Sequence, residues 1–141
     1  MSLARLIALP SFDDSRGALI AIEAPKDIPF NIERIYYIFN TESEGSRGFH
    51  AHKDLEQLAI CVSGRCDIVL DDGRQRETVS LKSPREGLFI GSMIWREMHN
   101  FSDNCVLLVL ASAQFDEADY IRDYNEFLKL HTSNKKLSFE N

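Results

Sequence analysis

The sequence predicts an all-β sandwich or barrel with a single helix at its C-terminal end. The first observation is a series of short apolar or alternating runs, separated by turn signals such as those at residues 15–17, 40–47 and 71–73. The second is that apolar residues take up helical spacing only after Asp116. The third is the length, because 141 residues fit one ordinary domain and are too few for two.

Eight segments are predicted as strands, and this number of short strands is typical of a sandwich or barrel. They are Ala18–Ile22, Arg34–Phe39, Gly48–His52, Gln57–Ser63, Arg65–Leu70, Glu77–Leu81, Gly87–Ile90 and Val106–Ala111. The Ser63-Gly64 pair is predicted to close a tight hairpin between two of them. The Asp72-Gly73 pair is typical of a type I′ turn.

The C-terminal helix is predicted over about residues 117–130, with Asp116 as its N-cap. The apolar or aromatic residues that define its period are Ala118, Ile121, Tyr124, Phe127 and Leu128. We expect this helix to pack on the barrel and to be followed by a polar tail over residues 132–141. Residues 1–141 then form one domain.

Composition excludes several classes of partner. The net charge of −6 argues against a nucleic-acid-binding surface spread over the domain. The N-terminal apolar stretch is too short for a signal peptide, and no run approaches the roughly 18 apolar residues of a membrane span. The three cysteines, Cys61, Cys66 and Cys105, have no metal-ligand spacing and are expected to be reduced. We therefore expect a cytoplasmic protein with no nucleic-acid or membrane partner.

The densest group of residues suited to chemistry is the segment Arg47–Lys53, RGFHAHK. Because alternate side chains of a strand share a face, His50 and His52 are predicted to point the same way. By the same parity Arg34 and Tyr36 share one face of their own strand. An arginine that points into a small barrel needs an ionic partner or a ligand, and a phosphate would serve.

The His-x-His pair followed by Gly64 resembles the metal-binding motif of the cupins. Two ligand positions of that motif are changed in this chain. Gln57 stands at the carboxylate position, and Arg96 stands where the second motif has its histidine. A guanidinium has no lone pair to give to a metal, and a neutral amide is a poor substitute for a carboxylate. We therefore expect no metal and no cofactor at this site.

Further segments resemble the dTDP-sugar 3,4-ketoisomerases over about residues 5 to 130. They are Arg34–Phe39, Arg47–Lys53, Leu58–Gly64, Trp95–Ser102 and Asp119–Tyr124. The resemblance implies a double-stranded β-helix, that is a cupin or jelly-roll barrel, and a homodimeric, metal-independent enzyme. It implies conversion of dTDP-4-keto-6-deoxyglucose to a dTDP-3-keto-6-deoxyhexose, on the way to the deoxyamino sugars of bacterial surface glycans such as lipopolysaccharide or S-layer glycan.

The resemblance carries the acid/base role onto His50 and His52, because imidazole suits proton transfer near neutral pH. It does not separate the roles of the two, and the stereochemistry at C4 of the product stays open. Arg34 and Tyr36 are expected beside the sugar or its oxyanion, with Tyr37 as second choice by strand parity. The residues expected to bind the substrate are Arg16, Arg47, Lys53, Gln57, Arg96 and Trp95.

The roles of Trp95 and of the Asp119–Tyr124 segment have to be weighed separately, and three other functions are compatible with the sequence. Trp95 either stacks on the thymine or fills the core, and the Asp119–Tyr124 segment is expected to be structural helix. The other functions are a dTDP-sugar 3,5-epimerase, a metal-dependent cupin oxygenase and a non-catalytic nucleotide-sugar-binding cupin. Gln57 and Arg96 oppose the oxygenase, and the Arg47–Lys53 and Asp119–Tyr124 segments favour the ketoisomerase over the epimerase.

Overall fold

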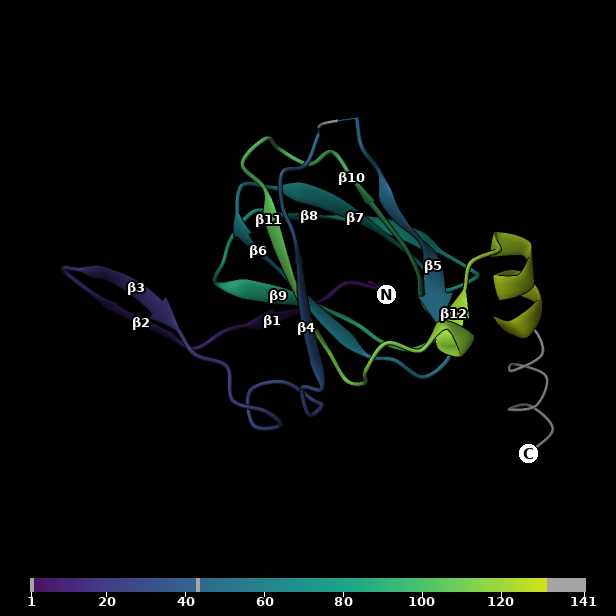
Figure 1. Ribbon diagram of the computed structural model, residues 1–141, viewed down its shortest axis with the longest axis horizontal. Coiled ribbons are helices and arrows are strands. Elements are labelled where there is room, and N and C mark those ends of the chain that lie inside the picture. Colours follow the sequence, from purple (N-terminus) through teal and green to yellow (C-terminus); the bar gives the residue numbers. More distant parts are fainter. Residues whose placement is uncertain (1, 43, 132–141) are drawn as a thin grey trace.

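The computed structural model describes residues 2–42 and 44–131. Within these residues, two five-stranded antiparallel sheets face each other, and two more strands form a separate hairpin (Figure 1). The first sheet has the order β1-β9-β6-β11-β4 and the second the order β12-β5-β10-β7-β8. The strands are β1 (Arg5–Ala8), β2 (Ser11–Asp14), β3 (Gly17–Ile20), β4 (Arg34–Ile38), β5 (Arg47–His52), β6 (Gln57–Ser63), β7 (Cys66–Asp71), β8 (Arg76–Leu81), β9 (Glu86–Ile90), β10 (Trp95–His99), β11 (Val106–Ala111) and β12 (Tyr120–Ile121).

The main core fills the space between the two sheets. Side chains two apart on each strand point inward, such as Ile68 and Leu70 on β7 and Leu107 and Val109 on β11, and all four are buried. The alternating pattern that predicts these strands is therefore the pattern that builds the interior. The all-β barrel expected from the sequence is confirmed.

The predicted hairpin at Ser63-Gly64 is wrong, because β6 and β7 lie in different sheets. Gly64 instead turns the chain from the first sheet to the second, with φ of +70°. The Asp72-Gly73 turn does join two paired strands, since β7 pairs with β8. Short local signals identify a turn but not the partners of the strands beside it.

Strand β10 is absent from the predicted set, and its sequence explains why. Arg96 and Met98 are the inward-facing residues of β10, so a charged side chain stands where an apolar one is expected. Trp95 points the other way, towards a second, smaller core. Strands β1, β2 and β12 are also missing from the prediction; β12 is only two residues long.

The C-terminal helix begins at residue 124, not at 117, and is described as far as residue 131. Asp116 caps only a short 3₁₀ turn, Glu117–Asp119, by accepting a hydrogen bond from the Ala118 amide at 3.1 Å. Asp123 is the cap of the helix itself, since its carboxylate accepts from the Glu126 amide at 2.9 Å. The helix packs its Phe127 on the outer side of the second sheet. The predicted polar tail, 132–141, lies outside the described residues.

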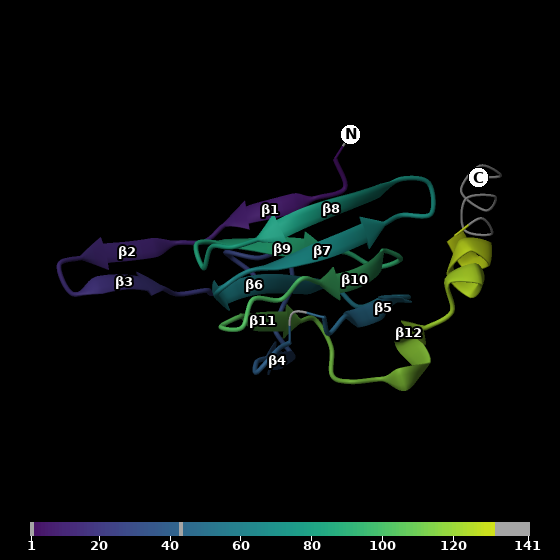
Figure 2. The ribbon, with the colours of Figure 1, turned by 90° about the horizontal axis from the view of Figure 1, so that it is seen from above.

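The β2–β3 hairpin stands away from the two sheets, at the opposite end of the molecule from β5 and the helix (Figures 1 and 2). Two of its large apolar side chains are mostly exposed, Phe12 at 63% and Leu19 at 59%. Arg16 lies at its turn and pairs with Asp14 at 2.6 Å. Among the described residues, no helix is long and apolar enough to cross a membrane.

Replacing Gly64 with alanine is expected to destabilise the fold by about 2 kcal/mol or more, because the residue has positive φ and no room for a Cβ. A Cβ there would lie 2.7 Å from Asn104 Oδ1 and 2.9 Å from the Cys105 Cα. Gly45→Ala is the matched control, since its Cβ would meet nothing closer than 3.4 Å. Urea unfolding of both variants checks the difference, and equal midpoints would contradict the argument.

Candidate active site

The two histidines of β5 face the interior together, as their spacing predicts. Their ring centroids lie 4.9 Å apart at an interplanar angle of 83°. The ladder between β5 and β10 shifts its register at Gly48-Phe49, where both residues have positive φ. This bulge leaves Phe49 outside and sets His50 directly opposite Arg96. Ala51, between the histidines, is fully buried on the other side of the sheet.

Arg96 is the most unusual residue of the barrel, because its side chain is completely buried. Its Nε and Nη2 donate to the carbonyl of Ile94 at 3.3 Å and 3.1 Å, and its Nη1 donates to Gln57 Oε1. Among the described residues no carboxylate pairs with it. Burial lowers the pKa of Arg96 to about 10, so the guanidinium still carries its charge at neutral pH.

Gln57 connects this arginine to a tyrosine. Its amide Nε2 donates to the Tyr36 hydroxyl oxygen at 3.2 Å, so the hydroxyl hydrogen of Tyr36 is left for another acceptor. Burial raises the pKa of Tyr36, which keeps the phenol protonated. Tyr37 points outward from the same strand with 61% of its surface exposed.

Burial, together with the nearby Arg96 charge, keeps both imidazoles neutral. It lowers the pKa of His50 to about 4 and that of His52 to about 2. Neutral imidazole is the form that accepts a proton, so both rings are in the state that a general base requires.

Asp119 holds one of the two rings. Its Oδ2 lies 3.1 Å from His52 Nδ1, and the same carboxylate accepts from the amides of Asp54 at 2.8 Å and Leu55 at 3.3 Å. The tautomer that donates Nδ1–H to Asp119 leaves the Nε2 lone pair of His52 facing the interior. Tyr120, the next residue along, packs against both rings, with centroids 5.0 Å from His50 and 4.3 Å from His52.

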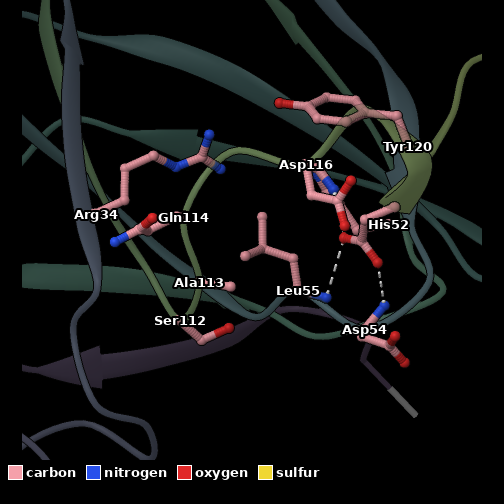
Figure 3. Close-up of a pocket in the computed structure, with 10 residues that line it drawn as sticks. Arg34, His52, Asp54, Leu55, Ser112, Ala113, Gln114, Asp116 and Tyr120 are labelled. Carbon is pink, nitrogen blue, oxygen red and sulfur yellow. Dashed lines mark hydrogen bonds and ion pairs between the residues drawn. The ribbon is translucent and has the colours of Figure 1, made fainter.

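Two adjoining pockets open beside these residues. One has a volume of about 330 Å³ and is lined by His52, Asp119, Tyr120 and Arg34 among others (Figure 3). The other is about 600 Å³ and is lined by Arg34, Tyr36, His50 and Tyr120. Figure 3 shows Arg34 reaching across from β4 towards the side that carries His52 and Tyr120.

Three buried polar atoms near these pockets have no hydrogen-bond partner within the described part of the chain: Arg34 Nε, His50 Nδ1 and His52 Nε2. Unpaired polar atoms are costly inside a protein. A polar ligand between Arg34 and the histidines would supply the missing partners. The arrangement is therefore suited to bind a polar, anionic molecule and to move protons on it.

The structure brings most of the predicted site residues together but not all of them. His50, His52, Arg34, Tyr36, Gln57 and Arg96 gather at this end of the barrel, and Arg47 lies at the rim of the larger pocket. Lys53 is exposed and lines neither pocket.

Two predicted ligand-binding residues lie elsewhere. Trp95 is on the opposite face of β10, packed on Tyr124 and Phe127 of the helix, so its position does not support stacking on a base. Its indole donates to Glu97 Oε2 at 3.0 Å. Arg16 lies on the distant hairpin and is exposed. Arg96 is enclosed in the barrel, which suits it to polarise the site better than to grip a diphosphate at its mouth.

Sequence reasoning missed Asp119, Tyr120 and Arg122, because it assigned them to a structural helix. They form the end of the 3₁₀ turn, the strand β12 and the residue after it. Strand β12 pairs Tyr120 with His52. Arg122 lines the larger pocket and stacks its guanidinium 4.2 Å from the Tyr120 ring centre. The resemblance of the Asp119–Tyr124 segment to the ketoisomerases is the sequence signal that indicates these residues.

Acidification is expected to destabilise the protein through His52. Its folded pKa lies below the unfolded value of 6.5, so the unfolded state binds more protons and stability is lost as pH falls below about 6.5. The free energy of unfolding should fall by about 1 kcal/mol per pH unit between pH 6 and 5 from this group. Urea unfolding of His52→Asn should show a slope shallower by that amount, with His99→Asn as control. Equal slopes in the wild type and His52→Asn would contradict it.

Comparison with known proteins places these residues in a family. The family model described as FdtA, WxcM-like, C-terminal matches residues 2–132. A curated TDP-4-oxo-6-deoxy-α-D-glucose-3,4-oxoisomerase from Aneurinibacillus thermoaerophilus is 52% identical over 125 residues, which are 89% of this chain and 90% of that protein.

Solved structures give the same answer. A 3,4-ketoisomerase from Helicobacter canadensis has a TM-score of 0.90 and 49% identity, covering 94% of this chain and 99% of that one. QdtA, a sugar 3,4-ketoisomerase from Thermoanaerobacterium thermosaccharolyticum solved with TDP, has a TM-score of 0.90 and 41% identity, with 93% and 96% covered. A histidine-to-asparagine mutant of QdtA has been solved with TDP-4-keto-6-deoxyglucose. The chain described here belongs to the FdtA family, whose members among these relatives are sugar 3,4-ketoisomerases.

Proposed function

We propose that this protein is an isomerase that converts dTDP-4-keto-6-deoxyglucose into a dTDP-3-keto-6-deoxyhexose. The observation that carries the proposal is the pair of neutral histidines with unpartnered ring nitrogens, set beside the buried charge of Arg96. A 52% identical relative with the corresponding oxoisomerase name supports the choice of substrate.

The reaction moves a ketone by two proton transfers at carbon and one between the two oxygens. A base removes the proton from C3, which gives an enediolate with negative charge on the C4 oxygen. A proton is then delivered to C4, while the hydroxyl proton on the C3 oxygen passes to the C4 oxygen. The products therefore have the same atoms as the substrate, and no electron acceptor is needed.

His50 is proposed to exchange the carbon-bound proton. It lines the larger pocket, which at about 600 Å³ has room for the sugar, and its Nδ1 has no partner among the described residues. His52 is 1% exposed and tied to Asp119, so we assign it to receive and return a proton beside His50. The Asp119 carboxylate stabilises the imidazolium that forms on His52.

The enediolate oxygen is proposed to lie against Tyr36 and Arg34. The Tyr36 hydroxyl hydrogen is available because Gln57 already donates to its oxygen, and Arg34 Nε is an unpartnered donor. The full charge of Arg96 lies behind them, in a part of the barrel closed to water. Preformed donors in such a place stabilise a developing negative charge most effectively.

The diphosphate is proposed to bind at the mouth of the larger pocket. Arg47 and Arg122 line it together with Arg34. Arg47 forms no salt bridge with any described residue, so its charge is available to a phosphate. Although the protein is acidic overall, arginine side chains are thus concentrated where the diphosphate of the ligand is proposed to bind.

We propose that the histidines work without a metal. Gln57 and Arg96 point into the interior from facing sheets and bond to each other, and Arg96 is the strand partner of His50. A cation at this position repels a second cation and offers no lone pair.

We also propose a homodimer in which the β2–β3 hairpin lies on a second copy. Phe12 and Leu19 of the hairpin are exposed, and so are Ile35 and Tyr37 on the edge strand β4. The turn between β2 and β3, which contains Arg16, lies at the opposite end of the molecule from β5, the strand that carries the histidines (Figure 1). In this arrangement Arg16 binds the ligand of the partner.

We propose that the enzyme works in the cytoplasm, because its three free thiols suit a reducing compartment. Its reaction would be one step towards surface glycans.

The chemistry is tested by following substrate in deuterated water by NMR. The wild type is expected to give 3-keto product and to incorporate deuterium at the reacting carbons. His50→Asn is expected to reduce both exchange and turnover by about 100-fold or more, and Asp119→Asn to reduce turnover less, about tenfold. The control is His99→Asn. Near wild-type turnover in a His50→Asn, His52→Asn double variant that still binds dTDP would refute the assignment, and exchange at C5 would indicate an epimerase.

The dimer is tested by mixing two impaired variants. If Arg16 acts across the interface, Arg16→Ala and His50→Asn chains refolded together form mixed dimers with one intact site. An equal mixture is then expected to regain about a quarter of the wild-type activity. If Arg16 acts within its own chain, mixing restores nothing. If Arg16 does not act at all, Arg16→Ala alone keeps wild-type activity. Sedimentation of the wild type as a monomer would contradict the dimer itself.

A further inference from the structure

All three cysteines of the chain meet inside the barrel. Their sulfur atoms lie within 4.8 Å of one another, and Cys61 Sγ is 3.8 Å from Cys105 Sγ. Cys61 lies on β6, Cys66 is the first residue of β7, and Cys105 directly precedes β11. All three are at most 1% exposed.

This group lies outside the candidate active site. Gln57 and Cys61 are both on the inner face of β6, four residues apart, which corresponds to about 13 Å along a strand. The thiols are therefore at the other end of the barrel interior from Arg96 and the histidines. Nothing in the proposed isomerisation uses them.

The spacing of the sulfurs matches that of a thiolate metal site. Thiolate–metal bonds are about 2.3 Å, so sulfurs around one ion are about 3.8 Å apart in a tetrahedral site and about 4.0 Å apart in a trigonal site. A disulfide, at about 2.05 Å, requires two of the sulfurs to move much closer. One ion fits between the three thiols with only small shifts.

The surroundings select the kind of ion. The three cysteines belong to the apolar core that also contains Leu81, Met98, Phe101 and Leu107. Oxygen-preferring ions have no ligands there, and within the described residues the group offers three histidine, cysteine or carboxylate ligands, not four. Zinc sites normally have four ligands, whereas soft monovalent copper is satisfied by three sulfurs.

We propose that Cys61, Cys66 and Cys105 form a binding site for one soft, thiophilic metal ion of low coordination number, such as Cu(I). Each thiol that ligates the ion loses its proton to solvent and forms a metal–sulfur bond, and the ion keeps its oxidation state. Because each thiol must lose its proton to bind the ion, affinity should increase with pH.

The ion has a short path to the site. Arg65 and Asn104, which directly precede Cys66 and Cys105, are exposed. The two turns that carry them are joined by Ser102, whose amide donates to the Arg65 carbonyl at 2.9 Å and whose hydroxyl accepts from the Arg65 amide at 2.9 Å. Neither hydrogen bond belongs to a strand ladder, so we expect an ion to enter between these two turns while both sheets stay paired.

The test is a competition for Cu(I) in the absence of oxygen. The reduced full-length protein is titrated into the coloured Cu(I)–bicinchoninate complex, and it is expected to withdraw one equivalent. Cys61→Ala, Cys66→Ala and Cys105→Ala should each weaken binding by about 100-fold or more, because each removes a ligand. Val79→Ala is the matched control, since it opens space in the same core and keeps all three sulfurs.

A second measurement uses the wild type alone. Cd(II) bound by thiolates absorbs in the ultraviolet, and the chain has three cysteines, so this absorbance can come only from them. It is expected to rise to one equivalent and stop. The proposal is overturned if the folded wild type takes up no Cu(I) and shows no Cd(II) absorbance at pH 8. It is also overturned if all folded single variants bind as tightly as Val79→Ala.

Discussion

A positive charge enclosed in the barrel, which forms no salt bridge with any described residue, is the constraint on which the rest of the site depends. Arg96 is held by a carbonyl and by the amide of Gln57, which orient its guanidinium without neutralising its charge. Both imidazoles are kept neutral partly by this charge. An anionic ligand is the natural counterion, so the charge that destabilises the empty barrel also favours the bound and reacting states.

Arg96 also explains how a barrel that resembles a metal-binding fold can be suited to proton transfer. The sequence identifies Gln57 and Arg96 as residues that stand at metal-ligand positions and as candidates for substrate binding, but it does not show that they contact each other. The structure shows that they bond to each other and that Gln57 extends the chain to Tyr36. Two residues that stand at expected metal-ligand positions thus belong to one connected polar group, and one amide side chain orients both the tyrosine and the arginine.

Local periodicity predicted which side chains share a face, and it was correct where a single strand decides the matter. His50 and His52 lie together for that reason, and so do Arg34 and Tyr36, with the Arg34 guanidinium 5.6 Å from the tyrosine ring centre. The prediction is wrong where the conformation depends on pairing between segments that are distant in the sequence. Asp119 and Tyr120 lie in the segment predicted as helix, but Tyr120 pairs with β5 as a strand residue, and the Asp119 carboxylate accepts a hydrogen bond from the Asp54 amide. The turn at Gly64 is predicted, yet no local signal shows that the chain passes there from one sheet to the other. For the same reason no local signal shows that Cys61 and Cys66 meet Cys105.

Strand β12 contributes Tyr120 to the site through only two residue pairs with β5, while β7 pairs with β10 over five residues and β6 with β11 over six. Amides in so short a ladder should exchange with solvent long before those of β6, β7 and β11. The wall of the pocket that carries Tyr120 is therefore held to the barrel less by backbone pairing than by the packing of Ile121 against Ala51 and Trp95. Side-chain packing in this smaller core, and not the strand ladder, then determines how readily this side of the pocket opens to a nucleotide-linked sugar.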